Sequence, residues 1–174
     1  MRLKIFLILV VVSSIVYANS IPNGFVYDDD IFVVENPHIR DIKNIPASFV
    51  HPEYITSLGH KSHYRPLVMI SYTINYWISG LNPAVFRLTN LLFHIGTSFM
   101  LFLTVYAMLN GRVQETDRRK SLFIAIASAL IFAVHPFNAE AVNYITARSS
   151  LMSGFFYLTA LYCWVRYREG KGGS

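Results

Sequence analysis

The sequence predicts an all-α integral membrane protein with four transmembrane helices and an external loop of short interfacial helices. Of the 174 residues, 53% are apolar and only 14% are charged, a balance typical of membrane proteins rather than soluble domains. The apolar residues fall in separate runs of helical length, and the Lys and Arg residues lie in short groups beside those runs. Such groups indicate membrane topology rather than nucleic-acid contacts, so we expect no nucleic-acid partner.

The first predicted transmembrane helix is residues 1–18, an apolar run that follows Arg2 and includes Lys4. The run is slightly short, because a span needs about 20 residues. The alternative is a cleaved signal peptide, since residues 16–18 offer small side chains at acceptable cleavage positions. Both interpretations place the chain from Asn19 onward outside the cytoplasm.

Residues 19–82 form the predicted external loop, in which we expect short helices on the membrane surface. Residues 66–81 begin with a proline, which suits a first helical turn. Their apolar residues recur at helical spacing: Leu67, Ile70, Ile74, Trp77 and Leu81. Because the stretch is too short to span and has a polar face, it predicts an interfacial or re-entrant helix.

The second predicted span, residues 83–109, carries a polar stripe. Arg87, Asn90, His94 and Thr97 are spaced three, four and three apart, so they share one helical face. Polar groups in a membrane helix face protein or water rather than lipid. Hydrogen bonding between helices explains Asn90 and Thr97, whereas Arg87, near the outer end, is better placed to meet a ligand.

The rest of the chain contains two further spans. The predicted segments are a cytoplasmic loop 110–120, a third span 121–137, a short external loop 138–150, a fourth span 151–167 and a flexible cytoplasmic tail 168–174. Nine of the fifteen Lys and Arg residues lie at the amino terminus, in the loop at 111–120 and in the carboxyl-terminal residues from Arg166 onward, while seven of the ten acids lie in the two opposite loops. The positive-inside rule then places both termini in the cytoplasm.

Three adjacent carboxylates, Asp28, Asp29 and Asp30, form the densest acidic cluster of the chain. Ionised neighbours repel, so water, a cation or a function must stabilise them. The predicted topology places Glu140 on the same external side. The plainer interpretation is an exposed turn or a helix cap, and a divalent cation held by these acids is a further alternative that we do not favour, because no ligand spacing is diagnostic.

Basic groups accompany these acids on the external side: Arg65, Arg87, His135 and Arg148. Arginine forks match phosphate oxygens, and a carboxylate can remove a proton from a hydroxyl group. A lipid phosphate leaving group and an alcohol acceptor would use both. Alternatively, His135 simply ends a helix before Pro136, and Arg148 extends its charge towards water.

Three motifs resemble one family. GFVYDDDIFVVENPHIR, then YRPL with NYWISGLNPAVFRLTNLLFH, then FAVHPFNAEAVNYITARSSLM are similar to the amino-terminal membrane region of the transmembrane and tetratricopeptide-repeat family of protein O-mannosyltransferases and its bacterial relatives. These belong to the multi-span glycosyltransferases of the GT-C fold. The resemblance covers roughly residues 24–165, in the same order and with similar spacing.

The resemblance implies a polyprenyl or dolichyl phosphate sugar as donor and transfer of one sugar, with inversion, to a hydroxyl group, with protein Ser or Thr as the expected acceptor. The family's paired acids match Asp28 and Asp29, one of which would be the general base, and the acid of its HP-x(3)-EA motif matches Glu140. Arg65 and Arg148 match arginines to which we assign a place near the donor phosphate. The candidate site is therefore Asp28, Asp29 and Glu140 as catalytic acids and Arg65, Arg148, His135 and Arg87 as phosphate ligands, with no metal or other cofactor.

The family has many more membrane helices and a carboxyl-terminal array of helical repeats. We therefore expect a partial GT-C-like module: a fragment, a degenerate copy or a subunit of a larger assembly. The alternative function is a small non-catalytic membrane subunit that packs against a partner, for which Ser153, Gly154 and Ala160 would give close helix contacts.

Overall fold

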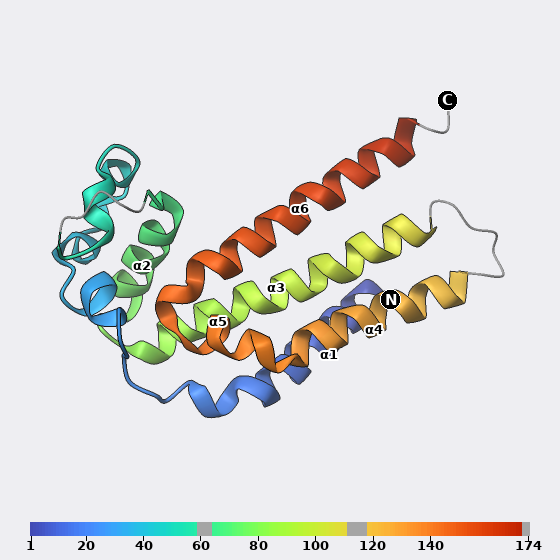
Figure 1. Cartoon of the computed structure of the whole chain (residues 1–174), viewed down its shortest axis with the longest axis horizontal. Helices are drawn as coiled ribbons and strands as arrows, with labels where there is room; N and C mark the ends of the chain where they lie inside the picture. Colours follow the sequence, from blue (N-terminus) through green and yellow to red (C-terminus); the bar gives the residue numbers. More distant parts are fainter. Residues whose placement is uncertain (59–63, 111–117, 172–174) are drawn as a thin grey trace. The chain divides into compact units, whose positions relative to one another are not determined.

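The computed structural model describes residues 1–58, 64–110 and 118–171, and within them every regular element is a helix (Figure 1). The all-α prediction is thus confirmed for the described chain. Residues 111–117 of the predicted cytoplasmic loop (110–120) and residues 172–174 of the predicted tail (168–174) lie outside the described residues. The chain divides into two compact units, one made of residues 1–18, 91–139 and 151–174 and the other of residues 19–90 and 140–150.

The first unit, which we call the long-helix unit, contains α1 (Arg2–Tyr17), most of α3 (Pro83–Asn110), α4 (Arg118–Val134), η8 (Pro136–Asn138) and most of α6 (Arg148–Lys171). Helix α1 packs against α4 (Figure 1). The contact face of α4 repeats every fourth residue through Ala125, Ala129 and Ala133, all fully buried. Small side chains at this spacing let Ile5 and Leu9 of α1 approach closely, as in membrane helix pairs.

Helices α3 and α6 meet through small residues and aromatic rings. A Cβ atom on Gly96 would lie only 3.0 Å from the Phe155 ring, and one on Gly154 would lie 3.6 Å from the methyl group of Thr97. The Phe93 and Phe155 rings stand edge to face with centroids 6.0 Å apart. Gly154 therefore faces its own unit rather than an outside partner.

Two described helices are long and apolar enough to cross a membrane: α1 with η1 (Ala18–Ser20), and α3. Helix α4 followed by Pro136–Asn143, with a 49° bend between them, makes a third if the bent pair counts as one span. Helix α6 does not meet the same measure, because its apolar stretch is short and flanked by Arg148 and Arg166. The four-span arrangement stays a prediction.

The second unit, which we call the short-helix unit, is built from single turns. Its elements are η1, η2 (Asp30–Val34), η3 (Pro37–Arg40), η4 (Ile42–Asn44), η5 (Pro46–Phe49), η6 (Pro52–Ile55), α2 (Pro66–Ser79), α5 (Ala139–Asn143) and η9 (Ile145–Ala147). Prolines begin η3, η5, η6 and α2, where a missing N–H group costs nothing.

Asn36 holds these turns together. Its amide group donates to the carbonyls of Phe32 (3.2 Å) and Tyr54 (3.0 Å), and its oxygen accepts from the His38 amide (2.9 Å). The side chain is fully buried, so each of its bonds replaces water. The turns around residues 32, 38 and 54 are thereby joined at one point.

The buried face of α2 is not its apolar stripe. Val68, Met69, Tyr72, Thr73 and Asn75 are buried, whereas four of the five residues in the predicted stripe are exposed. An apolar face turned outward is what an interfacial helix requires. Contact of α2 with a membrane surface remains a prediction.

Candidate active site

The acidic turn at residues 26–30 lies in the short-helix unit, and the side chain of Asp29 closes it. Tyr27 takes a positive φ of 51°, an uncommon conformation that tightens the turn. The Asp29 carboxylate accepts a hydrogen bond from the Val26 amide (3.1 Å), and the Asp30 amide donates to the Tyr27 carbonyl (3.2 Å). The Asp29 side chain therefore closes the turn and has 0% exposure, while Asp28 and Asp30 are exposed to solvent.

The turn is attached to a segment more than 110 residues further along the chain. The second carboxylate oxygen of Asp29 accepts a hydrogen bond from the Thr146 amide (3.1 Å), and the Asp28 amide donates to the Tyr144 hydroxyl (3.2 Å). The Tyr27 and Tyr144 rings stand edge to face with centroids 6.4 Å apart. Residues 26–30 and 144–146 thus form one substructure.

Glu140 lies on α5, immediately before this segment, and its side chain is exposed. The Glu140 carbonyl accepts a hydrogen bond from the Tyr144 amide (3.0 Å). The backbone that carries Glu140 is therefore continuous with the residues that hold Asp28 and Asp29. Two exposed carboxylates, Asp28 and Glu140, belong to one unit.

Arg87 is 2% exposed, and its guanidinium group binds backbone carbonyls. Its Nε donates to the Asn143 carbonyl (3.0 Å), and its two Nη atoms donate to the carbonyls of Asn23 and Gly24. These bonds fix the residues that precede the acidic turn. In this structure Arg87 organises the backbone around the site rather than presenting its donors at the surface.

Arg148 is fully buried and has a partner at each nitrogen. Nε donates to the Asn90 side-chain oxygen (2.8 Å), Nη1 to the Ser71 hydroxyl (2.9 Å) and Nη2 to the Phe86 carbonyl (2.8 Å). The guanidinium carbon also lies 4.6 Å from the centroid of the Tyr72 ring, within range of a cation–π contact. Arg148 thus joins α2, the start of α3 and the start of α6.

Asn90 completes this arrangement. Its amide group donates to the Tyr144 carbonyl (3.0 Å) while its oxygen accepts from Arg148. The predicted polar stripe of α3 is confirmed as an inward face, since Arg87, Asn90, His94 and Thr97 are all buried. The sequence could not indicate that Arg87 and Asn90 bind the 143–145 backbone, because backbone carbonyls have no sequence signature.

Arg65 and His135 differ from the two buried arginines. Arg65 is exposed, and one of its Nη atoms lies 3.3 Å from the Ser149 hydroxyl, which places it beside the start of α6. His135 belongs to the long-helix unit, where its Nδ1 accepts a hydrogen bond from the Phe137 amide (3.2 Å) and caps η8. Of the predicted phosphate ligands in the short-helix unit, Arg65 alone is exposed.

The electrostatics of the short-helix unit centre on Asp29. Burial raises the pKa of Asp29, and the amide hydrogen bonds from Val26 and Thr146 and the charge of Arg87 oppose that rise. Among the described residues, the buried charged side chains are Asp29, Arg87 and Arg148. One anion faces two cations, so the buried charges favour a further anion nearby.

Among the described residues, no three His, Cys, Asp or Glu side chains lie close enough together to hold a metal ion. The carboxylate oxygens of Asp29 both accept amide hydrogen bonds. What the substructure offers chemically is an exposed carboxylate, Asp28, in the same unit as the exposed Glu140 and the basic residues Arg65, Arg87 and Arg148.

Comparison with other proteins identifies relatives in several animals. Human TMTC4, a protein O-mannosyl-transferase, is 32% identical over 174 residues, which cover 94% of this chain and 23% of that protein. Mouse TMTC3, also a protein O-mannosyl-transferase, is 32% identical over 169 residues (95% of this chain, 17% of that protein). Drosophila melanogaster Tmtc1 is 28% identical over 156 residues (88% and 17%).

No family model matches the chain, and no solved structure matches it significantly. The chain spans less than a quarter of the length of the curated relatives described above. The family resemblance carried by the three motifs is nevertheless confirmed: nearly the whole chain is homologous to part of the TMTC protein O-mannosyl-transferases.

Proposed function

We propose that this chain is the amino-terminal part of a membrane glycosyltransferase that moves a sugar from a polyprenyl or dolichyl phosphate to a hydroxyl group, with inversion. The relatives are named protein O-mannosyl-transferases, which favours a protein Ser or Thr as acceptor. The observation that carries the proposal is the buried Asp29 carboxylate, which ties the acidic turn to Thr146. That bond holds an exposed carboxylate, Asp28, in a fixed place.

In the proposed reaction Asp28 is the general base. Its carboxylate takes the proton from the acceptor hydroxyl as that oxygen attacks the anomeric carbon from the face opposite the phosphate. The new carbon–oxygen bond forms while the bond from that carbon to the phosphate oxygen breaks, and the lipid phosphate leaves with the electron pair. Asp29 positions Asp28, and Glu140 is the second exposed acid of the site.

Arg65 is the best placed of the proposed phosphate ligands, because it is exposed just before α2 and lies beside Ser149 at the start of α6. A guanidinium fork binds two phosphate oxygens and stabilises the charge of the leaving group. The buried charges of Arg87 and Arg148 add positive potential in the same unit, and the phosphate role of His135, a residue of the long-helix unit, stays a prediction. No step of this reaction requires a metal ion.

The proposed topology puts the candidate site outside the cytoplasm. Four spans with both termini in the cytoplasm would place the acidic turn, Glu140 and Arg65 on the external or lumenal side, where a donor lipid and a secreted acceptor would meet. The chain would then be a partial GT-C-like module in contact with membrane lipids and, in a larger assembly, with other membrane subunits.

The test is transfer of radiolabelled mannose from a polyprenyl phosphate donor to an acceptor peptide by membranes containing the chain. Asp28→Asn should lower the rate about 100-fold or more, because general-base catalysis contributes at least that much. Asp30→Asn is the matched control: it removes an adjacent exposed carboxylate and leaves the backbone bonds of the turn intact.

Equal rates for the wild-type chain and Asp28→Asn would contradict the catalytic assignment. Equal losses in Asp28→Asn and Asp30→Asn would indicate that only the charge of the turn matters. Glu140→Gln tests the second acid in the same assay.

The alternative is a non-catalytic membrane subunit. Helix α1 exposes large apolar side chains at every fourth residue, Leu3, Leu7, Val11 and Ile15, and α6 exposes Ser153 and Ala160. Such faces pack against lipid or against other helices. Copurification of one stoichiometric membrane partner, with no mannose transfer by the wild-type chain, would favour this alternative.

A further inference from the structure

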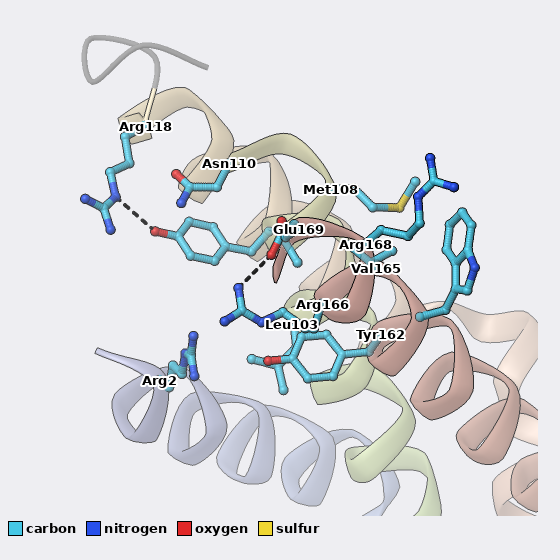
Figure 2. Close-up of a pocket in the computed structure, with 13 residues that line it drawn as sticks. Arg2, Leu103, Met108, Asn110, Arg118, Tyr162, Val165, Arg166, Arg168 and Glu169 are labelled. Atoms are coloured by element: carbon cyan, nitrogen blue, oxygen red, sulfur yellow. Dashed lines mark hydrogen bonds and ion pairs between the residues drawn. The ribbon is translucent and has the colours of Figure 1, made fainter. Parts of the chain in front are cut away.

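A pocket of about 820 Å³ lies in the long-helix unit, and none of its lining residues belongs to the acidic turn or to residues 140–146. The beginnings of α1 and α4 and the ends of α3 and α6 enclose it (Figure 2). Its polar and charged lining consists of Arg2, Tyr106, Asn110, Arg118, Tyr162, Arg166, Arg168 and Glu169. The pocket therefore marks the end of the unit at which these four helix termini meet.

The lining is strongly basic. It contains four arginines, from α1, α4 and α6, and one acid, Glu169, which gives a net charge of +3. Figure 2 shows Arg2, Arg118, Arg166 and Arg168 around the same space. Like charges gathered this way repel, so the pocket is a favourable place for an anion.

Neighbouring side chains orient three of these arginines. Arg166 donates to the Glu169 carboxylate (2.6 Å), and Arg118 donates to the Tyr106 hydroxyl (3.4 Å). The guanidinium carbon of Arg168 lies 5.6 Å from the centroid of the Trp164 ring. An arginine that is held in place loses less conformational entropy when its fork binds a phosphate group.

The surroundings of the pocket favour a lipid over a soluble anion. The pocket lies at the ends of α1 and α3, the two helices best suited to cross a membrane. Tyr162 and Trp164 suit the level of the lipid headgroups. Met108, which also lines the pocket, is 52% exposed and gives an acyl chain an apolar surface.

We propose that this pocket binds the phosphate of an anionic phospholipid headgroup, in the leaflet that the beginning of α1 and the end of α6 reach. Basic pockets between membrane helices bind such headgroups through arginine and lysine. The site is distinct from the proposed sugar-transfer site and depends on α1 and α3 spanning the membrane. The predicted topology makes this the cytoplasmic leaflet.

The test uses Trp164 as a local reporter. The chain has two tryptophans, so Trp77→Phe, a change at an exposed position of α2, leaves Trp164 as the sole indole. The protein is reconstituted in phosphatidylcholine vesicles that contain a few mole per cent of nitroxide-labelled phosphatidate or, in parallel, of phosphatidylcholine with the same label. Phosphatidate should quench Trp164 more strongly than labelled phosphatidylcholine at equal content.

The variant Arg118→Gln with Arg168→Gln should lower the apparent affinity for labelled phosphatidate about tenfold or more, because each basic group near a membrane surface contributes several-fold. The matched control is Arg119→Gln with Lys120→Gln, which removes the same charge from the beginning of α4 outside the lining. The control should keep the preference for phosphatidate. Mannose transfer should be unchanged in both double variants.

Equal quenching by the two labelled lipids would overturn the proposal, because the protein would then show no preference for the anionic lipid. Equal losses of phosphatidate affinity in the two double variants would also overturn it, because the attraction would then depend on total charge and not on the pocket. Displacement of labelled phosphatidate by millimolar inorganic phosphate would assign the pocket to a soluble phosphate compound instead. Absence of quenching by either lipid would contradict membrane insertion of this end of the chain. None of these readouts depends on sugar transfer, so the two proposals fail separately.

Discussion

Replacing Arg148 by Met tests whether this arginine stabilises the fold or serves a ligand. Its guanidinium group makes three hydrogen bonds of 2.8 to 2.9 Å and has no solvent exposure. Methionine fills similar space but leaves the Asn90 oxygen without its donor inside the unit. Each buried acceptor that is left without its donor costs about 1–3 kcal/mol, so the loss is a large share of the roughly 5–15 kcal/mol that stabilises a typical domain.

The free energy of unfolding can be measured by SDS titration in mixed micelles, with circular dichroism as the signal. Arg148→Lys should lose less stability than Arg148→Met, because an ammonium group keeps the charge and can still donate hydrogen bonds. It should remain less stable than wild type, because an ammonium group cannot reach three acceptors in one plane. Arg65→Met is the matched control, since Arg65 is exposed and has one long contact with Ser149. That variant should stay within about 0.5 kcal/mol of wild type.

The reasoning would be refuted by an Arg148→Met variant that is as stable as the Arg65→Met control. If that variant lost only mannose transfer, the guanidinium group would be reserved for the donor phosphate, and the hydrogen bonds to Asn90, Ser71 and Phe86 would contribute little to folding.

Two further predictions concern stability in the same titration. Asp29→Asn should cost about 1–3 kcal/mol, because one amide oxygen cannot accept from both Val26 and Thr146. Since burial raises the pKa of Asp29, the wild type should lose stability relative to Asp29→Asn as the pH rises from about 4 through that raised pKa; a pH-independent difference would contradict the buried carboxylate. Gly96→Ala should be less stable than Gly154→Ala. The new Cβ atom at position 96 would lie 3.0 Å from the Phe155 ring, whereas the one at position 154 would make an ordinary contact of 3.6 Å with Thr97. Equal stability of the two alanine variants would mean that the Phe155 ring moves aside at no cost.

Periodicity predicted the inward face of α3 correctly, because Arg87, Asn90, His94 and Thr97 follow the helical repeat. It could not distinguish a buried arginine from one that meets a ligand. Arg148 and Arg65 occupy comparable motif positions, yet one is fully buried and the other exposed. The difference depends on long-range partners such as Asn90, and no local pattern encodes those partners.

The apolar stripe of α2 lies outward, as an interfacial helix requires, so its periodicity alone does not locate the core. Leu67, Ile74 and Trp77 form a correct helical repeat but point outward. In a membrane protein the apolar face does not identify the core, because lipid covers it as well as protein does. The basic pocket at the end of the long-helix unit could not be predicted from the sequence either, because its four arginines come from three separate helices.

The hydrogen bond between Asp29 and the Thr146 amide also sets an order of events during synthesis. The two partners are 117 residues apart, so at roughly 5–20 residues per second the ribosome needs about 6–23 s to deliver Thr146 after Asp29. Until then the acidic turn has only its local bond to Val26. The charged turn therefore reaches its final arrangement late, after α1, α3 and α4 have emerged, and a chain that stalls before residue 146 carries Asp29 without the partner that buries it.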